Sequence, residues 1–318
     1  MRNVSIVIPN YNGKHFLENC LKAVFAQTIE NMEVIVVDNG STDGSQEYLD
    51  TYPGVRVLKM DKNYGFCGAV NAGIKEADSE YVILLNNDTE VEPDFAKELL
   101  TAIKADDRIF SCSSKMVQYH DRARMDDAGD YYCALGWAFG RGKGGPVENY
   151  DTPVNIFASC AGAAIYRKKM LESLGYFDEN HFAYLEDIDI GYRARIHGYK
   201  NVYAPKAVVY HVGSGFSGSA HNAFKVKLSS RNSVYLAYKN MPFLQIIVNS
   251  PFLLFGHLVK WLFFLKKGLG KDYVQGVKEG FTLCKREKKV RFLWKNLPNY
   301  LVIQLELWLN MARRLKKN

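Results

Sequence analysis

The chain has 318 residues, with 41 Lys plus Arg against 34 Asp plus Glu and a formal net charge of +7. This length is enough for one large domain or two ordinary ones with a sizeable core, and the composition excludes a disordered chain. None of the 6 cysteines forms a Cys-x-x-Cys pair, and the sequence starts directly with a strand pattern instead of a signal peptide. We therefore expect reduced thiols and a cytoplasmic protein.

The charge is distributed unevenly along the chain. Residues 225–318 hold 19 Lys plus Arg against 4 Asp plus Glu, a net of +15, whereas residues 1–224 hold 22 against 30, a net of −8. Two parts of opposite charge are expected to meet different partners. We predict a first domain over residues 1–235 and a basic, apolar helical segment over residues 236–318.

Short apolar runs alternate with segments of helical spacing in the first hundred residues. The pattern predicts strands over residues 4–8, 33–37, 55–60 and 81–85, and helices over residues 15–26 and 69–77. This alternation predicts an α/β fold with a parallel sheet covered by helices. The predicted strands are followed by Asn10, Asp38, Asn63 and Asp88. Since ligands bind at the carboxyl ends of such strands, these polar residues predict a site.

Six motifs occur in a fixed order along the chain. They are SIVIPNYN (5–12), VVDNGSTDGS (36–45), NYGFCGAVNAG (63–73), CAGAAIYR (160–167), LGYFDE (174–179) and YLEDIDI (184–190). Together with His211, this set resembles the family 2 glycosyltransferases over about residues 3–235. The resemblance implies the GT-A (Rossmann-like) fold, with a mostly parallel sheet flanked by helices, here followed by a C-terminal helical extension.

The resemblance implies a nucleotide site at the predicted strand ends. Asp38 resembles the family's carboxylate that accepts the ring N3–H of uracil or thymine, and a carboxylate suits this role because it accepts without donating. The other residues that the resemblance places at the nucleotide are Pro9, Asn10, Asn63, Gly65, Asn71 and Asn87. From the residues alone, Asp38 and Ser41 could instead cap the next helix, and Asn63, Gly65 and Asn71 could be turn residues.

The family's metal motif, Asp-x-Asp, is altered in this chain. The matching positions read Asn86-Asn87-Asp88, so the first carboxylate is missing, and an amide oxygen ligates a hard cation less strongly. The resemblance implies that Asp88 holds Mg²⁺ or Mn²⁺ across a diphosphate, with His211 completing the metal shell. Capping and hydrogen-bonding roles are the alternatives. The Gly/Ser-rich segment 213–219 predicts a mobile loop that closes over the diphosphate.

A second chemical centre is predicted at Glu186-Asp187-Ile188-Asp189, at the start of a helix that ends near Gly198. Acidic residues in a first helical turn are favourable in themselves. The resemblance makes Asp187, beside Glu186, the general base that takes the proton of the acceptor hydroxyl. Attack opposite the leaving diphosphate then inverts the anomeric carbon. We predict acceptor contacts for Asp189 and for Trp137, with a plain surface loop as the alternative for Trp137.

Residues 243–265 are rich in large apolar side chains and are long enough for a membrane span. The polar residues within this stretch argue against a span: Gln245, Asn249, His257 and Lys260. We expect an interfacial helix at the inner face of the cell membrane, with a buried core helix or a span as alternatives. A second helix is predicted over residues 299–315. Basic clusters flank both, and each such residue near an anionic leaflet contributes about 1 kcal/mol.

These observations predict an inverting, metal-dependent glycosyltransferase that acts on a growing, lipid-linked, cell-surface glycan. The Asn-Asn-Asp, Tyr-Phe-Asp-Glu and Glu-Asp-Ile-Asp motifs resemble the rhamnosyltransferase-like branch, which suggests dTDP-rhamnose as donor. The alternatives are a UDP-sugar transferase for N-acetylglucosamine, galactose or galactofuranose, and a non-catalytic membrane scaffold. Nucleotidyl transfer would need a Gly-rich basic loop that residues 9–13 lack. We expect no nucleic-acid partner, because no such motif is present, and a homodimer through the C-terminal helices stays open.

Overall fold

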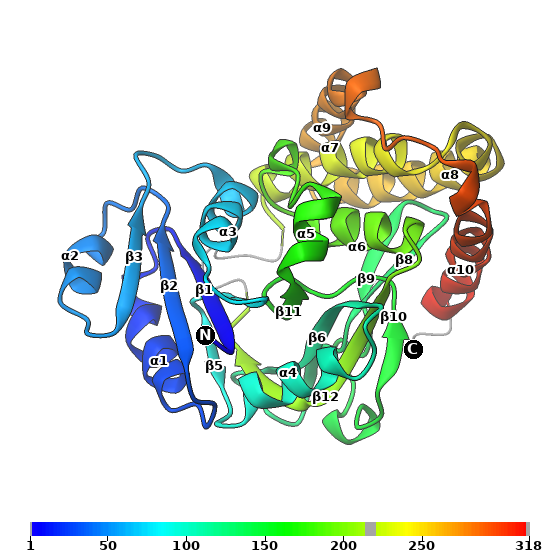
Figure 1. Cartoon of the computed structure of the whole chain (residues 1–318). Coiled ribbons are helices and arrows are strands. Elements are labelled where there is room, and N and C mark those ends of the chain that lie inside the picture. Colours follow the sequence, from blue (N-terminus) through cyan, green and yellow to red (C-terminus); the bar gives the residue numbers. More distant parts are fainter. Residues whose placement is uncertain (1, 214–220, 316–318) are drawn as a thin grey trace.

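A 10-stranded sheet forms the centre of the molecule in the computed structural model, which describes residues 2–213 and 221–315 (Figure 1). Along the sheet the main strands are β10 (Val154–Ile156), β12 (Lys200–His211), β6 (Ile109–Gln118), β11 (Ala163–Arg167), β4 (Tyr81–Leu85), β1 (Val4–Asn10), β2 (Met32–Asp38) and β3 (Val55–Lys59). Strands β1 to β4 are parallel, as are β6 and β12, whereas β11 is antiparallel to both of its neighbours. The predicted mostly parallel sheet is confirmed.

The remaining strands of the molecule, as far as the structure describes it, are short. Strand β5 (Thr89–Val91) pairs with β12, β7 (Met125–Asp127) pairs with β6, and β8 (Asp130–Cys133) and β9 (Trp137–Gly140) form a separate hairpin. The hairpin carries Asp130 at the start of β8 and Trp137 at the start of β9.

Helices cover both faces of the sheet. Helices α1 (Lys14–Phe25), α2 (Ser45–Asp50) and α4 (Phe95–Lys104) contribute to one core, and α3 (Gly65–Glu76), α5 (Lys168–Leu174) and α6 (Glu186–Ile196) to the other. Ile6 and Ile8 of β1 belong to the first core and Val7 to the second, as the two-residue period of a strand requires. Burial on both faces is why β4 is an unbroken apolar run and why Ser5 is the only polar residue of β1 before Asn10.

The chain ends in four long helices that gather on one side of the molecule (Figure 1). They are α7 (Ala223–Asn240), α8 (Phe243–Lys266), α9 (Gly270–Leu283) and α10 (Leu297–Leu315), and short 3-10 turns lie at η1 (Val147–Asn149), η2 (Glu179–His181), η3 (Arg286–Lys288) and η4 (Trp294–Asn296). Helix α7 runs through residue 235, and its Leu236 shares a core with Tyr192 of α6 and Ile303 of α10. The domain division at residue 235 stays a prediction.

Candidate active site

A cleft of about 780 Å³ lies at the carboxyl ends of β1 and β4. Predicted residues that line it are Pro9, Asn10, Asn63, Gly65, Asn87, Asp88, Glu186, Asp187 and His211. Asp88 and Asp187, the two centres predicted from separate motifs, therefore face one cavity. Its volume is in the usual range for a pocket that binds a ligand of nucleotide-sugar size.

A chain of hydrogen bonds joins the ends of three strands. The Asn87 side-chain amide donates to Asn10 Oδ1 (2.7 Å), and Asn10 Nδ2 donates to Asp38 Oδ2 (3.0 Å). The register of β1 and β2 sets Asn10 beside Asp38. A Cβ at Gly13 would lie 2.2 Å from Asn87 Nδ2, so only glycine leaves room for this arrangement. These hydrogen bonds hold the polar side chains at the strand ends together as one wall of the cleft.

Asp38 lies behind this wall and is fully buried. Its Oδ1 accepts from the Ser41 backbone N–H (3.0 Å) and from Gln46 Nε2 (2.8 Å). Helix α2 begins only at Ser45, so the Asp38 bond to Ser41 shapes the loop before the helix and does not cap the helix itself. A base that reached Asp38 would have to replace the Gln46 contact.

Gly65 has a left-handed backbone, with φ of 76°, and a Cβ there would lie 2.5 Å from the Phe182 carbonyl oxygen. Asn63 Oδ1 accepts the Gly65 N–H (2.8 Å), which satisfies a donor at the start of α3 and explains why the helix begins before the predicted residue 69. Gly65 is therefore required by the chain's own packing, whatever else approaches it.

Asp88, His211 and Asp126 form a row of polar groups in the cleft. Pairing of β5 with β12 sets His211 opposite Thr89 and so beside Asp88. His211 Nε2 lies 3.4 Å from Asp88 Oδ1, and His211 Nδ1 lies 2.6 Å from Asp126 Oδ2. Burial opposes a charge on His211, but its bonds to Asp126 and Asp88 outweigh this and raise its pKa to about 9. Carboxylate oxygen and neutral imidazole nitrogen fit a cation such as Mn²⁺, so binding of a cation at Nε2 would release the proton of His211.

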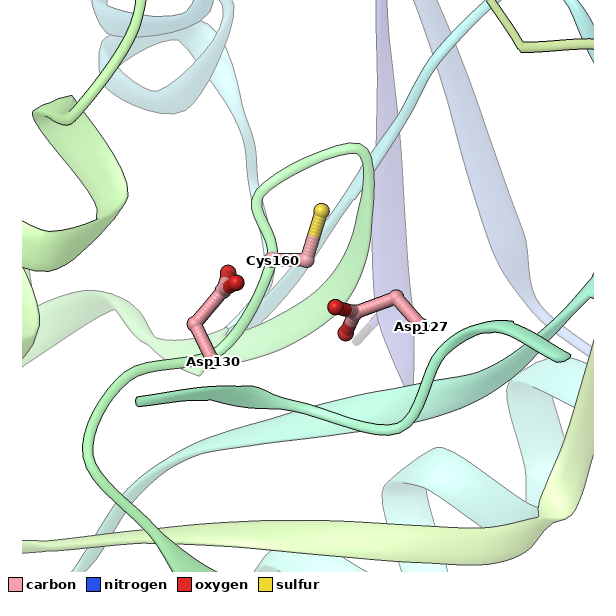
Figure 2. Close-up of side chains that lie close together, drawn as sticks. All are labelled: Asp127, Asp130 and Cys160. Carbon is pink, nitrogen blue, oxygen red and sulfur yellow. The ribbon is translucent and has the colours of Figure 1, made fainter. Parts of the chain in front are cut away.

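Three more polar groups meet deeper in the cleft (Figure 2). The ligand atoms of Asp127, Asp130 and Cys160 all lie within 4.8 Å of one another. Burial raises the pKa of Asp127 to about 7, despite a hydrogen bond from the Gly129 N–H. Burial and the neighbouring charges raise the pKa of Asp130 well above its usual range. This shift favours the protonated form of Asp130.

The acidic pair at the start of α6 has unequal proton affinities. Burial raises the pKa of Asp187 to about 6, although the Ile188 N–H (2.7 Å from Oδ1) and a hydrogen bond with Asp130 lower it. Burial and the charge of Asp187 raise the pKa of Glu186 to about 8. At neutral pH, Asp187 is thus the charged member of the pair.

Strained backbone leads into this helix. Left-handed φ angles of 63°, 69° and 67° occur at Phe182, Tyr184 and Leu185. Each costs on the order of 1–3 kcal/mol and must be held by its surroundings. Asn232 of α7 holds this segment, because its side-chain amide donates to the carbonyls of residues 181, 183 and 184 at 2.9, 2.8 and 2.7 Å.

Besides Asp38, which is buried behind the wall of the cleft, three predicted site residues do not line the cleft. Asn71 donates to the Phe177 carbonyl (2.8 Å) and accepts its N–H (3.1 Å), so it ties α3 to the segment before α6. Trp137 Nε1 donates to the Gly256 carbonyl (3.1 Å), so its indole packs on α8 instead of facing a sugar. Asp189 is fully buried in an ion-pair network. For these three residues the structure corrects the predicted ligand contacts.

Asp189 is held by a cluster of opposite charges. It accepts from Arg193 Nη2 at 2.6 Å and from Lys239 Nζ at 2.9 Å, and Lys239 also lies 2.6 Å from Asp178. Burial would favour the neutral acid, but the charges of Arg193 and Lys239 outweigh it and hold the pKa of Asp189 far below its usual range. This network anchors α6 to α7.

We expect Lys239→Met to lower the free energy of unfolding by about 3–5 kcal/mol, because it removes the cation beside Asp178 and leaves the buried Asp189 with Arg193 alone. Urea unfolding followed by circular dichroism measures this. The control is Lys59→Met, whose bridge to Asp50 (2.6 Å) is exposed, so its loss should stay within about 1 kcal/mol. Equal losses in both variants would show that the network does not stabilise the fold.

Sequence reasoning missed Asp126, Asp130 and Asn232. The first two belong to a run of three carboxylates in residues 126–130, which was a usable signal. Asn232 gave none, because one amide in a helix has no local pattern. The predicted loop at residues 213–219 lies, apart from Gly213, outside the described residues.

Residues 5–175, more than half of the chain, match the family model described as "Glycosyl transferase family 2". The chain belongs to this family. It is 28% identical over 230 residues to the uncharacterized protein y4gI of Sinorhizobium fredii, covering 68% of this chain and 25% of that one. It is 34% identical over 108 residues to glycosyltransferase GlyG of Streptococcus pneumoniae, covering 33% and 36%. The family 2 chain thus spans about a quarter to a third of these two relatives.

A longer match is to the N-acetylglucosaminyl-diphospho-decaprenol L-rhamnosyltransferase of Mycobacterium tuberculosis. This relative is 28% identical over 235 residues, which cover 65% of the present chain and 75% of the relative. The match carries no residue roles by itself.

Two solved structures confirm the predicted GT-A fold. GalNAc-T7, with UDP, GalNAc and Mn²⁺, has a TM-score of 0.59 at 18% identity and covers 74% of this family 2 chain and 47% of its own. The mannosyltransferase PcManGT from Pyrobaculum calidifontis, with GDP-Man and Mn²⁺, has a TM-score of 0.55 at 16% identity and covers 100% and 82%. At these identities the likeness concerns the fold alone.

Proposed function

We propose that this family 2 glycosyltransferase moves one sugar from a nucleotide-diphosphate donor to an acceptor hydroxyl, with inversion at the anomeric carbon. The observation that carries the proposal is that Asp88, at the sheet edge, and Asp187, at the start of α6, line the same cleft. A donor with its diphosphate near Asp88 would present the sugar between these carboxylates. An acceptor activated by Asp187 then attacks the face opposite the leaving group.

The residues present fit Mg²⁺ or Mn²⁺. Asp88 and His211 would hold the ion, because Asp126 occupies Nδ1 of His211 and leaves Nε2 toward Asp88. When bound, the ion offsets the negative charge of the departing diphosphate. Solved structures of the same fold hold Mn²⁺ with UDP or GDP-Man, which supports a divalent ion here. Asn86 stands where the first carboxylate of Asp-x-Asp is usual.

Asp187 is proposed to take the proton from the acceptor hydroxyl. Its pKa of about 6 leaves it charged at neutral pH yet basic enough to accept a proton. Glu186, with a pKa of about 8, is protonated there, so the negative charge of the acidic pair is concentrated on Asp187. The role of Asp130 is to position Asp187 and to lower its pKa through their hydrogen bond.

This arrangement predicts that Asp130→Ala shifts the acid limb of the rate profile to higher pH. Loss of the hydrogen bond raises the pKa of Asp187, and a bond to a charged group contributes about 1.5 kcal/mol, so the rate near pH 6 should fall by up to roughly tenfold. Asp130→Asn keeps an N–H donor and should keep the limb near that of wild type. Rates from pH 5 to 8 test this, and an identical limb in both variants would contradict it.

For the donor we propose dTDP-rhamnose first, supported by the name of the Mycobacterium tuberculosis relative. Transfer of another sugar from UDP is the alternative. Asp38 would read the pyrimidine N3–H after exchange of its Gln46 contact. The acceptor is proposed to be a lipid-linked glycan, which places the enzyme at the inner face of the cell membrane.

Thermal unfolding with a panel of nucleotide sugars and Mn²⁺ tests the proposal. A donor at 100 times its Kd adds about 2.7 kcal/mol to the free energy of unfolding, so the true donor should raise the Tm most. Metal-dependent hydrolysis of that donor without acceptor then distinguishes an enzyme from a scaffold. Absence of any shift across the panel would contradict a donor site.

A further inference from the structure

Helix α8 has its polar residues inside and its apolar residues outside. At spacings of three, four and seven residues it exposes Leu244 (74%), Ile247 (50%), Val248 (48%), Phe255 (58%), Leu258 (48%) and Leu262 (45%), which we call the apolar stripe. The residues that α8 buries are Gln245, Asn249 and Gly256. Single exposed apolar residues are common, but a continuous stripe marks a contact surface.

The buried residues fix α8 lengthwise against the protein. Gln245 accepts from the Tyr192 hydroxyl (2.7 Å), Asn249 exchanges two hydrogen bonds with Gln304 of α10 (2.8 and 2.9 Å), and the Gly256 carbonyl accepts from Trp137 (3.1 Å). From residue 245 to 256 the helix rises by about 16 Å. Among the described residues, α8 is the only helix long and apolar enough to cross a membrane. Attached side-on in this way, it cannot leave the domain to span one.

The neighbouring helix α10 extends the exposed apolar surface. Its Leu301, Val302, Leu305, Trp308 and Leu309 are exposed, whereas Ile303 and Leu307 are buried in the core shared with α6 and α7. Helix α10 therefore has apolar residues on both faces. The inner face fills the core, and the outer face has no partner within the described chain.

Charge decides between the candidate partners of this surface. Lys266 and Lys267 are exposed at the end of α8, and Arg313 and Arg314 are exposed at the end of α10. The segment from residue 225 onward carries a net charge of +15. A second copy on a two-fold axis would bring these like charges together. An anionic lipid leaflet attracts each of them instead.

We propose that the apolar stripe lies in the plane of an anionic lipid leaflet, with α8 parallel to the surface and its basic end at the headgroups. This inference rests on the proposed function, because a lipid-linked acceptor must enter the cleft from such a surface. The β8–β9 hairpin joins the two regions: Asp130 at its start contacts Asp187, and Trp137 at its other strand contacts α8. The helix that carries the apolar stripe thus contacts, through its buried side, the element that positions the base.

Co-sedimentation of the full chain with vesicles tests the proposal. We expect binding to phosphatidylcholine vesicles that contain phosphatidylglycerol, and at least tenfold weaker binding to pure phosphatidylcholine. The double variant Leu258→Glu with Leu262→Glu should bind the anionic vesicles at least tenfold less. The control Phe25→Glu changes an equally exposed aromatic residue (43%) on α1 and should bind like wild type. Equal loss in the control, or no binding by wild type, would overturn the proposal.

Charge variants and extraction test the orientation. Lys266→Glu with Lys267→Glu should weaken binding by roughly tenfold or more, because each lysine near an anionic leaflet contributes about fivefold. Lys97→Glu on α4 is the control.

The bound protein should be released by high salt at alkaline pH. Retention until detergent is added would show a span, and a wild-type dimer that the stripe variant converts to monomer would show a second copy on this face. Either result would overturn the proposal.

Donor binding separates this inference from the proposed function. The stripe variant should keep the donor-induced rise in Tm, which shows that it is folded. If no nucleotide sugar shifts the Tm of wild type while vesicle binding depends on the stripe, the proposed donor site is wrong and the lipid surface stands. If donors bind but vesicles do not, the lipid surface is wrong and the transferase stands.

Discussion

Replacing Asp187 with asparagine is expected to lower kcat by about 10²- to 10⁴-fold, the usual contribution of a positioned general base. The amide cannot take the acceptor's proton. It can still accept the Ile188 N–H, which holds Oδ1 at 2.7 Å in the native chain, so the side chain should keep its place. Donor binding, measured as the rise in Tm with a nucleotide sugar and Mn²⁺, should therefore be unchanged.

The pH dependence gives this prediction a second readout. Because Asp187 must be charged to act, and burial raises its pKa to about 6, the wild-type rate should rise with pH through about 6. The residual rate of the asparagine variant should lack this limb. Initial rates with saturating donor between pH 5 and 8 measure both effects.

Asp272 supplies the matched control for Asp187. It is also an aspartate in the first turn of a helix, α9, but it lies outside the cleft. Asp272→Asn removes only a favourable interaction with the helix dipole, which is worth about 0.3–1 kcal/mol, and should leave kcat unchanged. If Asp187→Asn turned over like this control, Asp187 would have only the capping role that its position offers any acidic residue.

The parts of the fold that could be predicted are those where local pattern and burial coincide. Strand β4 is buried at all five positions, and the predicted run 81–85 matches it residue for residue. Strand β12 was not predicted, because Pro205 lies beside a register shift between Ala204 and Val208 that breaks the strand pattern. The antiparallel direction of β11 could not be predicted either, since periodicity does not encode direction.

In the site, too, residues could be placed from the sequence only where the local pattern fixes their position. Asn10, Asn87 and Asp88 could be placed together because parallel strands end at one edge. Trp137 could not be placed, because the helix that covers it follows 119 residues later in the chain. In the predicted interfacial segment, Gln245 and Asn249 argued against a membrane span. In the structure these two residues face the protein, and the exposed side of the helix is apolar. Which side of a helix is outermost depends on its neighbours and not on its own sequence.

The second large effect is expected at the proposed metal site. Asp88→Asn should weaken Mn²⁺ binding by about 100-fold or more, because it removes the one carboxylate left of the Asp-x-Asp motif. Asp126→Asn should weaken it by about 10- to 100-fold, the usual effect of changing a residue that orients a histidine ligand. The native Asp126 holds His211 Nδ1 at 2.6 Å and so directs Nε2 toward Asp88. Titration of free Mn²⁺ by electron paramagnetic resonance, with nucleoside diphosphate present, measures both affinities.

Glu90→Gln is the control for this site, because Glu90 lies on β5 two residues after Asp88 and pairs with Arg122 at 3.1 Å outside the cleft. Its Mn²⁺ affinity should equal that of wild type. If all three variants bound Mn²⁺ equally, the ion would have to be held elsewhere, and Asp88 with His211 would be a structural pair. We expect a graded loss of Mn²⁺ affinity that is largest for the Asp88 variant, smaller for the Asp126 variant and absent for the Glu90 variant. This order of effects would mean that Asp88 and His211 hold the ion and that Asp126 orients His211. It would also explain how a chain with Asn86 in place of the first carboxylate can keep a metal site.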